Sequence, residues 1–238
     1  MIDFYFFHIG SDNDLAQMMI NSIKLTNENC KIYQLTDKNT PQIDKVDDCY
    51  RFDGNKNNIM KFRMEAYSKT QLNKNRYSLF LDTDMLVLKK LNLSKYFKNS
   101  EVLLCKREIN VNQVVNIDFN NMDMREYKDK ELGEVWPYLG CLIGVKSSSS
   151  LIRMNQMYNN LEEKYKIWYG DQIILKNFAR QNYSKTSFVG ELEYAHVPSD
   201  NKISKDTKII HFKGNRLKPY MKICYEYFFK HLTKSTNL

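Results

Sequence analysis

The chain has 238 residues, 42% of them hydrophobic, which is enough to bury one sizeable core and places residues 1–238 within the size range of a single domain. Its net charge of +8 favours an anionic partner such as nucleic acid, a membrane surface or a phosphorylated small molecule, although lysines spread along the whole chain also fit a merely solvated surface. No apolar run approaches the roughly 20 residues of a transmembrane helix, and the opening segment lacks the features of a signal peptide. The five scattered cysteines fit neither a disulfide framework nor a zinc site. We therefore expect a cytoplasmic protein.

Short apolar runs and helical spacings alternate through the first third of the chain. Strands are predicted at residues 4–9, 31–35 and 77–81, and helices at residues 15–23 and 59–69. This alternation indicates an α/β protein of the doubly wound class, in which a mostly parallel central sheet is flanked by helices. Such sheets bind their ligands beyond the carboxyl ends of the strands, and we expect a site at that edge.

The pattern continues in the second half of the chain. Strands are predicted at residues 102–105 and 142–145, and helices at residues 151–165, after a serine patch, and 171–179. Residues 108–134 are polar and weakly periodic, which is typical of an active-site loop or of a small excursion from the core.

Two acids interrupt an apolar, strand-like run at residues 79–88. Burying Asp82 and Asp84 there costs solvation free energy unless a cation compensates their charge. Side chains two residues apart in extended backbone point the same way, so both carboxylates can converge on one ion, and hard oxygen ligands suit Mg²⁺ or Mn²⁺. A bare Asp-x-Asp is more often a solvated turn or a helix cap, but the apolar run and the place after a buried strand favour a metal site.

Three ordered segments resemble the GT-A glycosyltransferases, and in particular the retaining family that includes glycogenin and bacterial lipopolysaccharide galactosyltransferases. Residues 81–84 read Leu-Asp-Thr-Asp and match the family's LDxD turn, and residues 170–175 match its Asp-Gln helix start. Residues 211–220 resemble its HxxGxxKPW motif, with Lys218 one residue late and Tyr220 in place of the tryptophan. The resemblance implies a GT-A fold, which is Rossmann-like, over most of the chain.

The resemblance also assigns metal-binding and catalytic residues. It makes His211 the third protein ligand of the metal beside Asp82 and Asp84, and an imidazole beside two carboxylates favours Mn²⁺ over Mg²⁺. It gives Asp171 and Gln172 the role of positioning donor and acceptor and of stabilising an oxocarbenium-like centre. The alternatives are a satisfied histidine at a strand end and a helix cap at Asp171.

Further residues correspond to the family's donor-binding positions. Ser11 and Asp12 match the uracil and ribose pocket, or else cap the following helix, and Lys61 and Arg63 match a basic donor contact, or else form an exposed basic helix face. Trp168 and Tyr169 could supply a stacking surface for an acceptor sugar, or else belong to the core. The complete predicted set of donor-binding residues is Ser11, Asp12, Lys61, Arg63, Thr83, Gly140, Gly214 and Lys218.

These residues together predict a metal-dependent glycosyltransferase. It would move a hexose-type sugar from a nucleotide diphosphate donor, UDP in the first instance, to a glycan or lipid-linked acceptor with retention. Two other classes stay open: a sugar-phosphate nucleotidyltransferase, although the glycine-rich loop that it needs after the first strand is missing, and a non-catalytic protein that binds nucleic acid or an anionic surface, although basic and aromatic residues form no recognisable nucleic-acid module.

The end of the chain mixes aromatic residues with lysines. Residues 219–238 are expected to form an amphipathic extension that either packs on the core or lies on an anionic membrane. In the second case the protein would be peripheral at the inner face of a membrane, with a lipid-linked or lipopolysaccharide acceptor.

Overall fold

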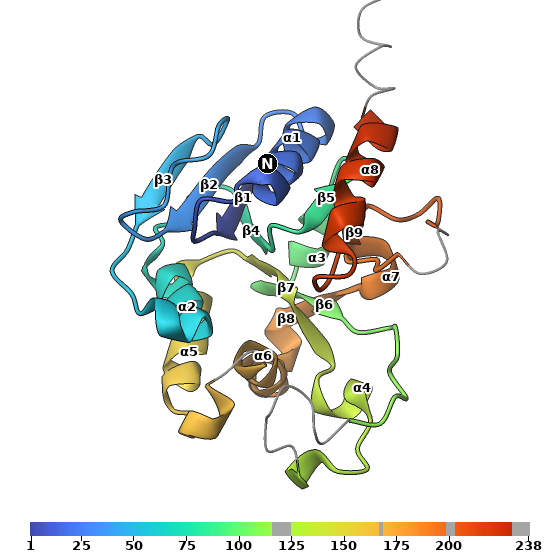
Figure 1. The fold of residues 1–238 in the computed structure, drawn as a ribbon. Helices are drawn as coiled ribbons and strands as arrows, with labels where there is room; N and C mark the ends of the chain where they lie inside the picture. Colours follow the sequence, from blue (N-terminus) through green and yellow to red (C-terminus); the bar gives the residue numbers. More distant parts are fainter. Residues whose placement is uncertain (116–124, 167–168, 199–202, 230–238) are drawn as a thin grey trace, which may run out of the picture.

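The computed structural model describes residues 1–115, 125–166, 169–198 and 203–229. These residues form an α/β unit around a seven-stranded sheet, in the order β3-β2-β1-β4-β7-β6-β8 (Figure 1). The strands of this sheet are β1 (Ile2–Phe7), β2 (Lys31–Thr36), β3 (Asp48–Arg51), β4 (Tyr77–Leu81), β6 (Val102–Lys106), β7 (Tyr138–Val145) and β8 (Thr186–Gly190).

The sheet is mostly parallel. Strands β3, β2, β1 and β4 pair in parallel, as do β6 and β8, whereas β7 runs antiparallel to both of its neighbours, β4 and β6. The predicted α/β class with a mostly parallel sheet flanked by helices is therefore confirmed, and the single reversed strand, β7, is an addition to it. Since β1 and β4 are parallel neighbours, the residues that follow them emerge at the same edge of the sheet.

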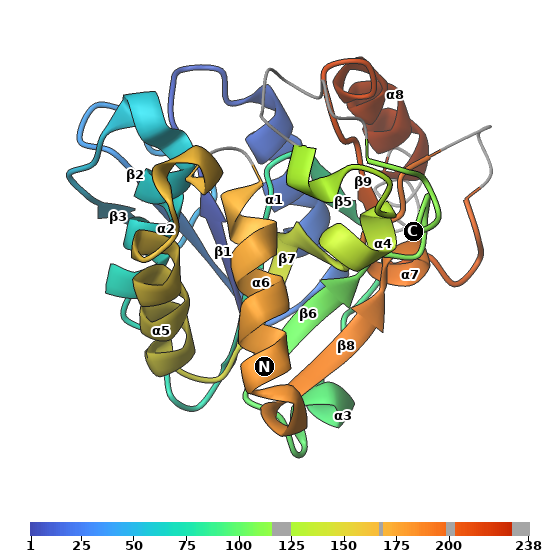
Figure 2. The same cartoon turned by 90° about the horizontal axis from the view of Figure 1, so that it is seen from below.

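Helices cover both faces of this sheet. Figure 2 shows α2, α5 and α6 in front of one face, and α1 and α8 lie against each other on the other side. Successive residues of β1 alternate between the two cores: Phe4 and Phe6 pack with α1 and α8, and Tyr5 packs with the other three helices. The helices are α1 (Asp14–Thr26), α2 (Ile59–Lys69), α3 (Ser94–Phe97), α4 (Leu132–Val135), α5 (Ser148–Asn159), α6 (Gly170–Gln181), α7 (Glu191–Tyr194) and α8 (Lys218–Phe229).

A second, two-stranded sheet joins distant parts of the sequence. Strand β5 (Met85–Val87) pairs antiparallel with β9 (Ile209–His211), and Met85 stands opposite His211. The amide of Phe212 donates to the carbonyl of Asp84 at 2.8 Å and extends this pairing by one residue. The turn after β4 and the end of β9 are thereby fixed side by side.

Several element boundaries differ from those expected from the sequence. Strand β1 occupies residues 2–7 instead of 4–9, since His8 and Ile9 already belong to the loop. Helix α5 ends at Asn159 instead of continuing to residue 165. The apolar run at residues 79–88 is not one strand, because the chain turns at residues 82–84 and enters the second sheet.

The segment between β6 and β7 is a small excursion with its own apolar cluster. Val115, Val135 and Trp136 pack there with Tyr169, whose ring is stacked on that of Trp136 at a centroid distance of 4.5 Å. Residues 116–124 of the predicted polar segment lie outside the described residues.

The C-terminal extension is helical where the structure describes it. Helix α8 contacts α1 and β5 and buries Met221 and Phe229, while Tyr220, Ile223 and Tyr227 are exposed. Its residues 230–238 lie outside the described part of the chain. Among the described residues, no helix is both long and apolar enough to cross a bilayer.

Candidate metal and substrate site

Most of the predicted site residues line one pocket at the carboxyl edge of β1 and β4. The pocket brings together segments that are far apart in sequence: the turn after β4, the start of α6 and the loop after β9. The predicted residues among its lining are Arg63, Asp82, Thr83, Asp84, Gly140, Asp171, Gln172, His211, Gly214 and Lys218.

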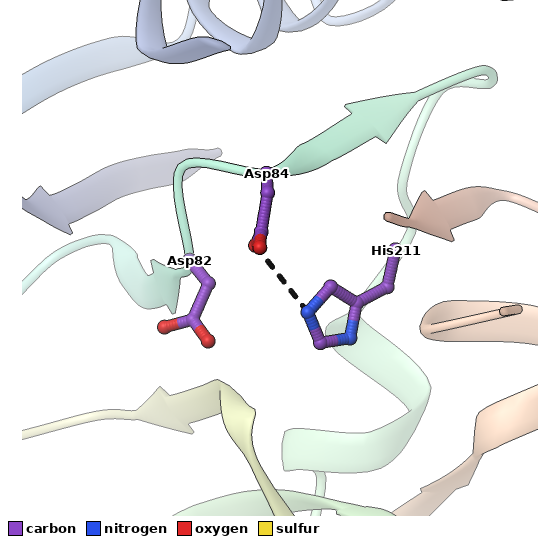
Figure 3. A group of neighbouring side chains, drawn as sticks. All are labelled: Asp82, Asp84 and His211. Atoms are coloured by element: carbon purple, nitrogen blue, oxygen red, sulfur yellow. Dashed lines mark ion pairs between the residues drawn. The ribbon is translucent and has the colours of Figure 1, made fainter. Parts of the chain in front are cut away.

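The three predicted metal ligands form a cluster. Asp82 directly follows β4, Asp84 directly precedes β5 and His211 ends β9, and their side chains face a common space (Figure 3). The Nε2 atom of His211 lies 3.3 Å from Oδ1 of Asp84, and one ligand atom from each residue lies within 4.8 Å of the others. Donor atoms at such separations can share one ion after small side-chain movements, so the cluster could hold a metal.

The electrostatics of the cluster are those of buried, interacting charges. Burial by itself raises the pKa of Asp84, but the hydrogen bond and charge of His211 and the nearby ammonium group of Lys218 lower it below its ordinary value. Burial raises the pKa of Asp82, against the opposing effect of Arg63. Desolvation also raises the pKa of Cys141, whose thiol faces His211, to about 11, so this group is a neutral thiol at neutral pH.

Arg63 connects the metal cluster to the start of α6. Its Nη1 donates to Oδ1 of Asp82 at 3.0 Å, and its Nη2 donates to Oδ2 of Asp171 at 2.5 Å. The guanidinium is largely buried, and its pKa is raised because the negative charges around it, together with Tyr67, outweigh the opposing effect of desolvation. One cation therefore holds two carboxylates in fixed positions within the pocket.

Asp171 is engaged through both of its oxygen atoms. Besides the contact between Oδ2 and Arg63, Oδ1 accepts a hydrogen bond from the backbone amide of Gln172 at 2.8 Å. The Asp171 side chain is only 4% exposed, and burial raises its pKa in spite of Arg63. A carboxylate so restrained is suited to orienting and stabilising charge more than to attacking as a free nucleophile.

The segment after β9 places a glycine in the left-handed conformation and a lysine at the rim of the pocket. Gly214 adopts a φ of +78°, in the left-handed region that favours glycine, and a Cβ there would meet nothing within 4 Å. Lys218 begins α8, and its Nζ lies 3.8 Å from Oδ2 of Asp84. The extra residue in this motif thus leaves the ammonium group of Lys218 within the pocket, whereas Arg216 is exposed and not part of the lining.

Three predicted donor-binding residues do not line this pocket. Ser11 and Asp12 are exposed in the loop after β1, where Asp12 accepts a long 3.4 Å hydrogen bond from the amide of Asp14 near the start of α1. Lys61 is exposed because two residues correspond to about 200° around a helix, which turns it away from the side on which Arg63 enters the pocket. Of the proposed stacking pair, Trp168 lies outside the described residues and Tyr169 lines the pocket.

Two buried charged residues near the pocket were not predicted from the sequence. Glu191, which directly follows β8, belongs to the lining, and Arg107, which directly follows β6, donates from Nη2 to Oε1 of Gln172 at 3.2 Å. Both stand at the carboxyl ends of parallel strands, so the rule that singled out Asp82 could have found them. Strand β8 was not predicted, and without it Glu191 had no such position.

Comparison with known proteins adds no assignment. No protein-family model matches the chain, and no curated protein sequence matches it.

Proposed function

We propose that the chain is a metal-dependent glycosyltransferase of the GT-A fold that uses a nucleotide diphosphate sugar, UDP-linked in the first instance, as donor. One observation carries the proposal: the Asp82, Asp84 and His211 cluster shares a pocket with the Arg63 and Asp171 pair and with Lys218. A cation site, a positive charge at the rim and a restrained carboxylate are the parts needed to hold a diphosphate and to stabilise a sugar cation.

The residues present fit Mn²⁺ or Mg²⁺. Two carboxylates and one imidazole supply hard oxygen and nitrogen donors, and the adjacent Cys141 is a neutral thiol and so a poor ligand. Asp82, Asp84 and His211 would hold the ion, which when bound supplies positive charge that stabilises the departing diphosphate.

The protein side chains divide the remaining work. Lys218 neutralises a phosphate oxygen, and the backbone at Gly214 is open enough for close approach of a phosphate group. Asp171 faces the pocket with both oxygen atoms already engaged, which supports a role in stabilising positive charge on the sugar and fits a front-face, retaining reaction. Little side-chain acid or base chemistry is then required, because the leaving phosphate itself accepts the proton of the acceptor hydroxyl.

The acceptor is proposed to be a glycan or a lipid-linked sugar. The exposed residues Tyr220, Ile223 and Tyr227 of α8 lie on the helix that begins at Lys218, at the rim of the pocket, and support an acceptor presented from a membrane surface. Flotation with anionic and neutral liposomes tests this part separately, and absence of binding to both would remove the membrane from the proposal.

A panel of nucleotide sugars tests the central proposal. Each donor is added with Mn²⁺, and both the melting temperature and donor hydrolysis are recorded for the wild type, for Asp84→Asn and for the exposed control Glu162→Gln. We expect one donor to raise the melting temperature and to turn over only with metal, in the wild type and the control but not in Asp84→Asn. Strongly salt-dependent DNA binding with no response to any donor would instead support a nucleic-acid-binding protein.

A further inference from the structure

We propose that Arg107 is a positioning residue that fixes the side-chain amide of Gln172, so that this amide presents its N–H donors to the pocket. The inference deepens the proposed function, on which its kinetic part rests. It predicts that the sugar atom or acceptor atom beside Gln172 is a hydrogen-bond acceptor, such as a hydroxyl or ring oxygen.

The orientation of the amide follows from the chemistry of arginine. Arg107 donates from Nη2 to the amide of Gln172 at 3.2 Å, and a guanidinium has donors but no acceptor. The atom of Gln172 that faces Arg107 must therefore be Oε1, which places the NH₂ group on the other branch of the amide. Among the described residues no acceptor pairs with Nε2 of Gln172, and Gln172 lines the pocket, so its donors are available to a substrate.

Arg107 is itself held rigidly. It is 7% exposed, its Nε donates to the carbonyl of Trp136 at 2.8 Å, and its backbone amide donates to the carbonyl of Pro137 at 2.8 Å. The guanidinium thus spans from the residues just before β7 to the start of α6. A residue fixed at both its backbone and its side chain can impose one orientation on a neighbouring amide.

A pair of carboxylates anchors the chain directly after Arg107. Glu191 Oε2 accepts from the backbone amides of Glu108 and Ile109, each at 2.9 Å, and Glu108 Oε2 in turn accepts from the amide of Leu192 at 3.0 Å. The end of β6 is therefore tied to β8 on one side and to β7 on the other. This arrangement accounts for the buried carboxylate of Glu191 at the pocket without giving it a role in the chemistry.

Kinetics of three variants test the proposal. In Arg107→Met the amide loses its fixed orientation, and we expect kcat to fall about tenfold to a hundredfold, in the range of a misplaced transition-state donor, with KM nearly unchanged. Arg107→Lys keeps one donor and should recover part of the rate. Arg153→Met is the matched control, because Arg153 also donates to a glutamine of α6, Gln181 at 3.1 Å, but on the exposed surface; its kcat should equal that of the wild type.

Replacing the amide of Gln172 with a carboxylate supplies a second test that does not depend on removing Arg107. Gln172→Glu keeps a partner for Arg107 but presents an oxygen acceptor to the pocket in place of N–H donors. We expect turnover to fall at least as far as in Arg107→Met, while Mn²⁺ and UDP together raise the melting temperature as in the wild type. Full turnover in Gln172→Glu would overturn the proposal.

Side-chain ¹⁵N relaxation of the Gln172 NH₂ group separates this inference from the proposed function. The resonance is assigned by its loss in Gln172→Glu, and we expect a rigid NH₂ group in the wild type and in Arg153→Met but a mobile one in Arg107→Met. Unchanged mobility in Arg107→Met would overturn the positioning role. If no nucleotide sugar is turned over by the wild type, the proposed function fails, while the relaxation data still decide whether Arg107 orients the amide.

Discussion

Gly140 lies against the carboxylate of Asp171, so closely that a Cβ at residue 140 would stand 1.8 Å from Oδ2 of Asp171. No real Cβ contact is this short, and the same Cβ would come within 3.4 Å of Nη2 of Arg63. The glycine thus allows the Arg63 and Asp171 pair to close over β7. Gly140 was predicted to bind the donor, and this close approach is a separate physical reason for a glycine at residue 140 that does not depend on contact with the substrate.

Gly140→Ala should displace Asp171 and lower both stability and turnover. We expect a loss of about 1–3 kcal/mol in the free energy of unfolding, typical of overpacking, measured by urea titration. Gly144→Ala is the control on the same strand, because its Cβ would stand 3.0 Å from Leu103 and Phe97 in the core. It should also be destabilised but should keep its donor turnover per folded molecule, and an equal loss of turnover in both variants would contradict the role given to Gly140.

Removing Arg63 should leave two carboxylates without their cation. Breaking a buried ion pair lowers the free energy of unfolding by about 3–5 kcal/mol. Because Asp82 is partly exposed, we expect Arg63→Met to lose about 3 kcal/mol, near the lower end of this range. The double variant Arg63→Met with Asp171→Asn removes one of the unpaired charges and should regain part of this stability. Lys61→Met, on the exposed side of α2, is the stability control, and its free energy of unfolding should stay within about 0.5 kcal/mol of the wild type. If the losses of the two single variants simply add in the double variant, Arg63 and Asp171 do not stabilise the fold as a pair.

The carboxylate of Asp37, which directly follows β2, should make the stability of the fold fall in acid. Burial acts to raise the pKa of Asp37, but Lys56 and the amides of Thr40 and Asn39, at 2.7 and 3.1 Å, lower it well below its ordinary value. A depressed folded-state pKa contributes stability that is present above the unfolded pKa of about 3.9 and is lost as the pH falls through the folded value.

Asp37→Asn should therefore be less stable at neutral pH and lose less stability on acidification than the wild type. Urea titrations between pH 7 and pH 3 measure the difference. Asp53→Asn serves as the control, since Asp53 forms an exposed ion pair with Lys38 and should leave the pH profile almost unchanged. Parallel profiles for Asp37→Asn and the wild type would contradict the assignment.

Divalent cations should stabilise the fold through His211. Mn²⁺ at a hundred times its dissociation constant adds about 2.7 kcal/mol, which corresponds to a rise of roughly 5–10 °C in melting temperature for a chain of this size. EDTA should reverse the rise, and Ca²⁺ should give a smaller one, because imidazole nitrogen is a poor ligand for it. His211→Ala should abolish the response to Mn²⁺; a full response in this variant would show that the ion binds elsewhere.

The sequence predicted the elements whose signal is local. The local residue pattern is sufficient to predict the strands β1, β2 and β4, which are apolar runs, and the helices α2 and α6, which have amphipathic spacing. Strands β5 and β9 were missed because each has only three residues, too few to show a periodic pattern, and each forms a strand only by pairing with the other. Strand β3 was missed for a related reason, since its Asp-Cys-Tyr-Arg sequence is that of a half-exposed edge strand.

The candidate site was predictable where a motif names it. Asp82, Asp84 and His211 do lie together as the sequence suggested, although the presence of an ion stays a prediction. Arg107 could have been found by its place after a predicted strand, whereas Glu191 could not, because β8 was not predicted. The hydrogen bonds that give both residues their roles depend on contacts between β6, β7 and β8 that only the folded sheet creates. The double role of Arg63 was hidden in the same way, since Asp82 and Asp171 are its partners only in three dimensions.

The pairing of β5 with β9 also bears on how the protein is made. Asp82 and Asp84 leave the ribosome long before His211, which completes their cluster only when β9 adds to β5. A nascent chain that has reached the end of β8 holds every strand of the main sheet but lacks its third ligand and Lys218. Under the proposed function, a chain that has been synthesised only as far as β8 would not hydrolyse nucleotide sugars, because the catalytic site is completed only by residues that follow the last strand of the main sheet.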